Sequence, residues 1–221
     1  MATTKEEREN RLRTKTAKKE KSNKSNFISE DEYLKREFLA ETKSEYHAGK
    51  VVAMAGATYV HNLLVSRLIV QLSNCMEEKD CEVINSDMLI HIPECKKYVY
   101  PDVTVICGKP EFAEKKKGRS EALTNPQIVV EVLSKGTAEY DMGEKMICYL
   151  KLKNLKQYVI VSSERKSIIT YTKDKDGDFK VKTYSENEDI LIGECKIPIE
   201  KIYNKVGFEM ESKEEENQEK E

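Results

Sequence analysis

Apolar residues recur along this chain with two different spacings, and these spacings predict its main helices and strands. Between about Tyr59 and Lys79 they lie three or four positions apart, which predicts the longest helix of the chain, with one face in the core. Apolar runs within residues 98–107, 128–133 and 157–161 predict buried strands. Alternation within residues 81–92, 168–171 and 179–184 predicts further strands, the first with a turn near Asn85 and Ser86 and the last two joined by a K-D-K-D-G-D turn.

Shorter signals complete the predicted order of elements. Ser29 and Glu32 have the spacing of a capping box, which predicts a helix from there to about Ala40. Gly49 predicts a turn between two short extended segments, and residues 141–151 predict a second helix after the run at 128–133. Residues 108–125 are typical of a surface loop, and 190–192 and 197–199 of short edge strands. This order predicts an α/β (α+β) fold with a mixed central sheet flanked by helices.

The two ends of the chain differ from the rest in charge and in apolar content. Residues 1–26 hold nine Lys or Arg and four Glu, whereas residues 209–221 hold seven Glu and two Lys. Such charge runs bury little apolar surface, so we expect a disordered basic tail and a disordered acidic tail around one domain at 27–208. The tails cancel in the net charge of −2, which therefore says little about partners.

Several classes of protein are disfavoured by what the sequence lacks. Its apolar runs are too short to cross a bilayer, and the N-terminal stretch has no hydrophobic signal-peptide core, so we expect no membrane association. The six cysteines form no C-x-x-C and do not cluster with histidine at zinc-ligand spacing. We therefore expect reduced thiols and a cytoplasmic protein.

The candidate chemistry lies in two acidic residues within apolar strands and a lysine in the helix that follows. Asp102 and Glu131 would each be costly to bury unless paired or bound to a cation. If their strands are neighbours, the two carboxylates suit a hard cation such as Mg²⁺ or Mn²⁺. Such a metal can acidify its bound water for attack on a phosphodiester, and Lys145 would orient that water or neutralise the phosphate.

Each of these residues also has a plainer interpretation. Asp102 follows Pro101 and can cap the start of a strand, and Asp141 fits a helix N-cap better than a ligand. His61 can be a polar residue that packs at the start of the long helix, or it can line the site. Glu131 is the hardest to explain in this way, because the apolar residues around it leave little water to solvate the carboxylate.

The ordered motifs resemble the Uma-type restriction endonuclease family of the PD-(D/E)XK nuclease superfamily. The matching motifs are P-D at 101–102, E-V-L-S at 131–134 and D-x-x-x-K-x-x-x-Y at 141–149. Upstream, Glu45, Gly49 and Met54 followed by His61 resemble the opening of the family pattern. The resemblance covers roughly residues 28 to 205.

This resemblance implies a restriction-endonuclease-like core and a set of site residues. Glu45 would join Asp102 and Glu131 as the acidic, metal-binding set, with His61, Tyr149 and Val132 lining the site. Many superfamily members place their lysine two residues after the glutamate, where this chain has Leu133. Lys145 is the preferred replacement, and Lys135 is the alternative.

Two hypotheses follow from the sequence. The first is a Mg²⁺- or Mn²⁺-dependent endonuclease that hydrolyses DNA, with a homodimer implied by the superfamily. The second is a catalytically inactive member of the same fold that acts as a binding or scaffold protein. The missing lysine at position 133 motivates the second.

Overall fold

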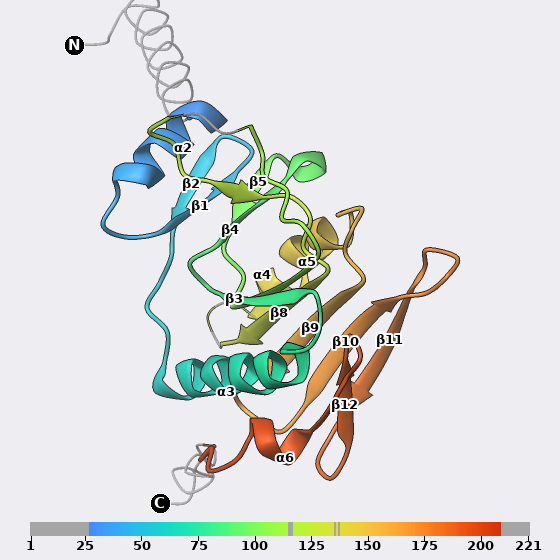
Figure 1. The fold of residues 1–221 in the computed structure, drawn as a ribbon. Coiled ribbons are helices and arrows are strands. Elements are labelled where there is room, and N and C mark those ends of the chain that lie inside the picture. Colours follow the sequence, from blue (N-terminus) through green and yellow to red (C-terminus); the bar gives the residue numbers. More distant parts are fainter. Residues whose placement is uncertain (1–26, 115–116, 135, 137, 209–221) are drawn as a thin grey trace, which may run out of the picture.

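A computed structural model describes residues 27–114, 117–134, 136 and 138–208 of the chain. The helices are α2 (Glu30–Leu39), α3 (Tyr59–Met76), α4 (Ala138–Met142), α5 (Glu144–Tyr149) and α6 (Ile199–Ile202), with a 3₁₀ helix η1 (Pro93–Cys95). Both predicted tails and Lys135 lie outside the described residues, so their predictions stay predictions. Figure 1 shows the arrangement of these elements.

The strands form two larger sheets and one hairpin. A five-stranded sheet has the order β2 (Lys50–Ala53), β1 (Ser44–His47), β5 (Lys97–Val99), β4 (Leu89–Ile92) and β7 (Ala122–Leu123). A six-stranded sheet has the order β11 (Phe179–Tyr184), β10 (Ile168–Lys173), β9 (Gln157–Ser162), β8 (Ile128–Leu133), β6 (Val103–Cys107) and β3 (Cys81–Asn85). The hairpin pairs β12 (Asp189–Ile192) with β13 (Cys195–Pro198).

The predicted fold class is confirmed, with one difference in how the sheets are divided. Antiparallel pairs join most strands, and β8 runs parallel to β9, so the six-stranded sheet is mixed. The predicted strand at 98–107 is interrupted at Pro101 and Asp102, and its two parts enter different sheets. Proline lacks the amide donor that a central strand needs, which explains the break. The segment 81–92 turns after Asn85, close to the predicted turn, and its two strands also enter different sheets.

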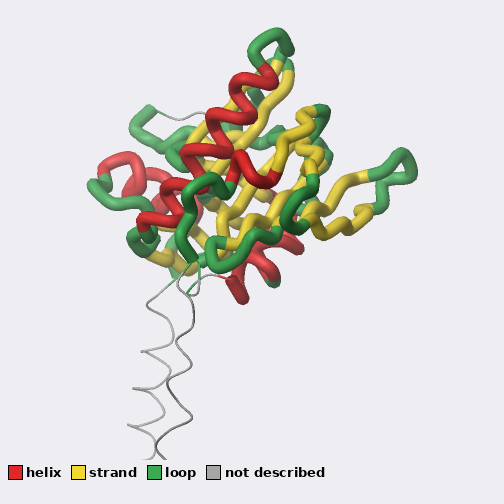
Figure 2. The backbone as a smooth tube through the Cα atoms, turned by 90° about the horizontal axis from the view of Figure 1, so that it is seen from below, coloured by secondary structure: helices red, strands yellow, loops and turns green. Residues whose placement is uncertain are grey.

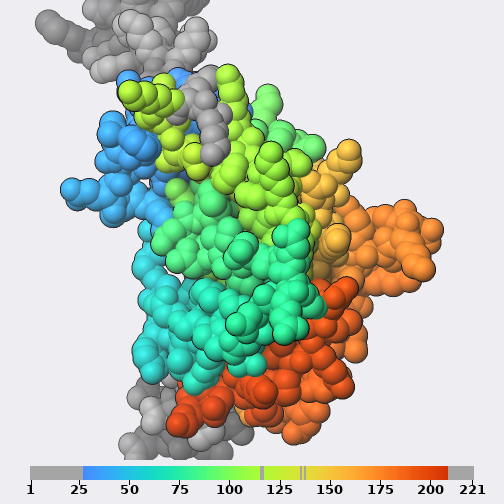
Figure 3. Space-filling model, viewed as in Figure 1, coloured from blue at the N-terminus to red at the C-terminus, as the bar shows by residue number. Residues whose placement is uncertain are grey.

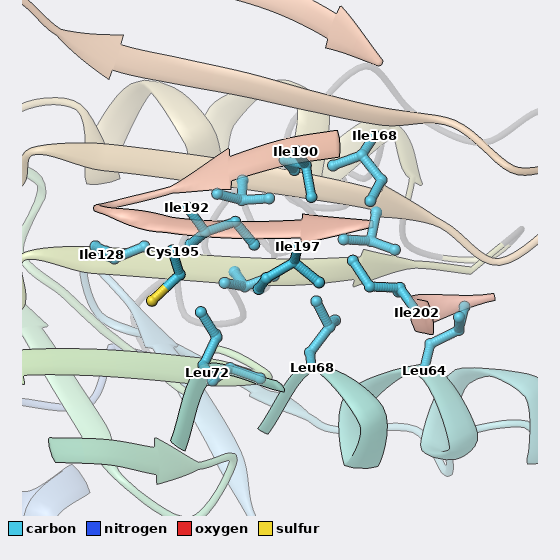
Figure 4. Packing of buried hydrophobic residues seen from close by; sticks show 14 of the residues in the cluster. Leu64, Leu68, Leu72, Ile128, Ile168, Ile190, Ile192, Cys195, Ile197 and Ile202 are labelled. Atoms are coloured by element: carbon cyan, nitrogen blue, oxygen red, sulfur yellow. The ribbon is translucent and has the colours of Figure 1, made fainter. Parts of the chain in front are cut away.

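The two faces of the six-stranded sheet are covered by different elements. Leu64, Leu68 and Leu72 of α3 pack on one face together with the isoleucines of the β12–β13 hairpin and α6 (Figure 4). Helix α5 covers the other face through Tyr149, which packs among Val129, Tyr158 and Ile160. Figure 2 shows the strands gathered in the middle with helices outside them, and Figure 3 shows the surface of α3 in contact with the C-terminal segments.

The helix ends follow the sequence signals in part. The Ser29 hydroxyl accepts a hydrogen bond from the Glu32 amide, as predicted, but the Glu32 carboxylate pairs with Arg36 instead of reaching back. The predicted helix at 141–151 is replaced by two shorter helices separated at Gly143. Asp141 therefore lies inside α4 and is buried, which corrects its prediction as an N-cap.

The expectation of reduced thiols is wrong in this structure. All six cysteines form disulfides, which join Cys75 to Cys195, Cys81 to Cys107 and Cys95 to Cys148. The pairs are 120, 26 and 53 residues apart in sequence, so their proximity arises only from the fold. The cytoplasmic location stays a prediction, without the support that the cysteines gave it. Within the described residues, no helix is both long and apolar enough to span a membrane.

Candidate active site

The ammonium group of Lys145 lies among three buried carboxylates. Its Nζ is 3.0 Å from Glu45 Oε1, 3.0 Å from Glu131 Oε1 and 3.6 Å from Asp141 Oδ1. All four side chains are at most 8% exposed. We call Glu45, Glu131, Asp141 and Lys145 the lysine cluster.

Four separate elements bring the lysine cluster together. Glu131 lies in β8, whose side chains at odd positions face α5, and Glu45 lies in β1 of the other sheet. Helices α4 and α5 supply Asp141 and Lys145, four residues apart and therefore on neighbouring turns. The cluster thus sits where the two sheets and the α4–α5 pair meet.

The electrostatics of the cluster are dominated by burial and by an excess of negative charge. Desolvation raises the pKa of Glu131 well above its usual range, and the charges of Asp102 and Asp141 add to this effect against the attraction of Lys145. Desolvation alone would lower the pKa of Lys145, but Glu131, Glu45 and Asp141 hold it well above its usual value. Burial opposes ionisation of Glu45, yet hydrogen bonds from His47 and Lys145 lower its pKa. Lys145 is therefore a fixed positive charge.

Tyr149 contacts the same oxygen of Glu131 as Lys145 does. Its hydroxyl donates to Glu131 Oε1 across 3.1 Å, and its ring stacks on Tyr158 at a centroid distance of 5.4 Å. Tyr158 in turn donates to the carbonyl of Asp141. The structure thus places Tyr149 in the site that its spacing from Lys145 suggested.

The Tyr149→Phe variant should lower the free energy of unfolding by about 1–3 kcal/mol, because a buried carboxylate loses a donor. Urea unfolding of this variant can be compared with Tyr171→Phe, whose hydroxyl belongs to a partly buried tyrosine on the same sheet. Equal stability of the two variants would show that the Tyr149 bond adds nothing.

Asp102 occupies a neighbouring position with its own partners. Its Oδ2 accepts a hydrogen bond of 2.7 Å from the Val132 amide of β8 and lies 3.1 Å from His61 Nε2. His61 comes from the first turn of α3, where Thr58 caps the helix. The register that pairs Val103 with Val130 places Asp102 at the end of β6 next to Glu131. His61 and Val132 therefore both line the site through Asp102.

The predicted three-carboxylate metal set is only partly assembled. Among the residues that the structure describes, no group of three or more His, Cys, Asp or Glu side chains is arranged to hold a metal ion. Glu45 is engaged by Lys145, by the Tyr100 amide and by His47. Glu45 is engaged through both oxygens, whereas the contacts of Asp102 involve Oδ2 and those of Glu131 involve Oε1 among the described residues. Mg²⁺ sites often use only one or two carboxylates with retained waters.

Three further residues, Tyr140, His47 and Lys97, adjoin the site and were not singled out from the sequence. Tyr140 stacks on His47, and its hydroxyl lies 3.0 Å from His47 Nε2 and 3.5 Å from Glu45 Oε2. The buried Lys97 donates to the Tyr140 hydroxyl and pairs with Glu144 at 2.9 Å. These contacts link Glu45 to α4 and α5. Of these residues, only His47 could have been recognised from the sequence. It lies two residues after Glu45 and therefore on the same face of its strand.

The mixed sheet flanked by helices, with buried acidic residues around a lysine, defines a nuclease-like class of fold. A solved structure of a putative nuclease of the DUF820 group from Anabaena variabilis superposes with a TM-score of 0.63 at 16% identity, covering 80% of this chain and 97% of that one. The family model Uma2, described as "Putative restriction endonuclease", matches residues 30–200. The chain belongs to this family.

Two proteins from Synechocystis are similar in sequence. The uncharacterized protein slr1290 is 35% identical over 161 residues, which cover 73% of this chain and 82% of that protein. The uncharacterized protein sll1609 is 35% identical over 135 residues, which cover 61% of this chain and 75% of that protein.

Proposed function

We propose that this protein is a metal-dependent endonuclease that hydrolyses phosphodiester bonds in DNA. The observation that carries the proposal is Lys145 Nζ, buried 3.0 Å from both Glu45 and Glu131, with Asp102 beside Glu131 at the end of the neighbouring strand. Membership of the restriction endonuclease family supports the reaction class. DNA as the substrate and the metal requirement are parts of this proposal.

Asp102 and Glu131 would hold the Mg²⁺ or Mn²⁺ ion. The residues fit such an ion, because Asp102 and the three carboxylates around Lys145 outnumber that lysine, and burial, together with the charges of Asp102 and Asp141, raises the pKa of Glu131. When bound, the metal would lower the pKa of its water and stabilise charge on the phosphoryl oxygens. We assign Glu45 to holding Lys145 in place, since its oxygens are already engaged.

The role of Lys145 follows from its charge. Its neighbours raise its pKa, so the ammonium stays protonated and does not act as a base. It would instead donate hydrogen bonds to the phosphate and neutralise the charge that develops as water attacks phosphorus and the leaving oxygen departs. Tyr149 and Glu45 would position Lys145 and Glu131 for this role.

The test compares plasmid cleavage by the full chain in Mn²⁺ and in EDTA. We expect cleavage only with the metal, and a rate about a hundredfold lower in Asp102→Asn, because one of two metal-binding carboxylates is lost. Asp176→Asn, in an exposed turn, is the matched control and should cleave as the wild type does. Metal-independent cleavage, or an unchanged rate in Asp102→Asn, would contradict the proposed site.

A non-catalytic binding or scaffold protein is the second candidate. It is favoured by the near-complete burial of Lys145, whose side chain is 6% exposed and engaged by three carboxylates. If the ion binds only the native state, Mn²⁺ at a hundredfold excess over Kd should stabilise the fold by about 2.7 kcal/mol. An absence of both stabilisation and cleavage would favour the scaffold. The homodimer stays a prediction that analytical ultracentrifugation can check.

A further inference from the structure

A hollow of about 270 Å³ lies at the ends of the parallel strands β8 and β9, beyond Glu131 in β8. Ile160 lines this hollow and is the register partner of Glu131. Leu133 lines it too, and because it lies two residues after Glu131 its side chain faces the same side of the sheet. Met142, which follows Asp141 in α4, also lines it. The hollow therefore lies on the same side of the sheet as Glu131, about two residues further along β8.

The walls and the rim of the hollow differ in chemistry. Leu133, Ile160, Ile169 and Met142 make apolar walls, whereas the hydroxyls of Ser162 and Ser167 lie among the lining groups. Arg165 and Glu164 are exposed on the β9–β10 turn at the same opening. Apolar walls suit the flat faces of a base, and hydroxyls and a carboxylate suit its polar edge. The Arg165 guanidinium suits a phosphate.

The size of the hollow limits what can enter. A volume of about 270 Å³ is near the lower end for small-molecule sites, which fits one nucleotide and leaves no room for a base pair. Enzymes that need one base in a small pocket act on single strands or turn that base out of the duplex. We infer that this hollow receives one unpaired nucleotide next to the phosphate at the lysine cluster, so that the protein prefers single-stranded or locally opened DNA. This inference rests on the proposed function.

The test is a binding measurement that does not require cleavage. Fluorescence anisotropy in EDTA compares a labelled single-stranded 12-mer with the same sequence as a duplex. We expect tighter binding of the single strand, and about a tenfold loss in Ala138→Leu, which fills the hollow, in line with the loss of one base contact. Arg165→Ala should also weaken single-strand binding. Ala40→Leu, at the exposed end of α2, is the control and should bind as the wild type does.

The outcomes separate this inference from the proposed function. If the filled variant loses single-strand affinity and melts at the wild-type temperature, the hollow is a nucleotide site even if no cleavage is ever seen. If single strand and duplex bind equally, or if neither binds, or if Ala138→Leu and Arg165→Ala change nothing, the inference is overturned. Metal-dependent cleavage in that case would leave the nuclease intact.

Discussion

The Lys145→Met variant should lose about 3–5 kcal/mol of unfolding free energy at pH 7, because it removes the cation shared by three buried carboxylates. If the proposed function holds, it should also lower the rate of metal-dependent cleavage about a thousandfold, since the charge proposed to face the phosphate is removed. Urea unfolding and plasmid cleavage measure the two effects. Lys151→Met, at an exposed position just after α5, is the matched control and should change neither.

The pH dependence of this loss has a definite sign. The pKa of Glu131 is raised in the folded state, so its contribution to stability is present below the ordinary glutamate range and falls as the pH rises through its folded value. Removal of Lys145 makes ionisation of the buried Glu131 less favourable, so the variant loses more stability than the wild type as the pH rises. The difference in unfolding free energy between the two proteins should therefore shrink when the pH is lowered from 8 to 5. A deficit below 1 kcal/mol, or one that grows on acidification, would contradict the stabilising pairing of Lys145 with Glu131.

Replacement of Cys75 and Cys195 together by alanine should lower the unfolding free energy by about 5 kcal/mol, measured without reductant. Their disulfide closes a separation of 120 residues, and loop-closure entropy of that length gives roughly this value. The same substitutions at Cys81 and Cys107, which are 26 residues apart, should cost about 3.5 kcal/mol. A larger loss for the Cys75–Cys195 pair than for the Cys81–Cys107 pair would support these disulfides, and the reverse order would contradict them.

A thiol count provides an independent check on the disulfides. The denatured protein, purified without reductant from an oxidising compartment, should show no free thiols, and six after reduction. Six free thiols before reduction would falsify the pairing and restore the expectation of a reduced protein. Stability that is insensitive to dithiothreitol would point the same way.

The sequence predicts those site residues that can be recognised from their immediate neighbours in the chain. Glu131 stands out because a carboxylate within a β-branched run has no local explanation, and the structure buries it as that run implies. Lys145 and Tyr149 share a helical face four residues apart, but the resemblance to a family is what distinguished them from an ordinary helix surface. Glu45 has no such signal in its own segment, and only the resemblance to a family identified it.

The remaining site residues depend on contacts between distant segments. Asp141 looks like an N-cap because Gly136 and Thr137 suggest a later helix start, whereas α4 begins at Ala138 and carries Asp141 toward Lys145. Tyr140 and Lys97 gain their roles only where α4 meets the five-stranded sheet, 43 residues apart in sequence. Contacts between segments this far apart cannot be read from local periodicity. The same holds for strand pairing, which is why the segments 81–92 and 98–107 are each divided between two sheets.

Two of the three disulfides span the segment that connects β6 to β7. Cys75 and Cys95 precede this segment, and their partners Cys195 and Cys148 follow it. A trypsin cut after the exposed Lys117 would therefore give a two-chain protein that migrates as one band until it is reduced. Glu45 would belong to one chain and Glu131 with Lys145 to the other. The connection between β6 and β7 is thus a natural place to divide the molecule into two halves, each of which carries part of the proposed site.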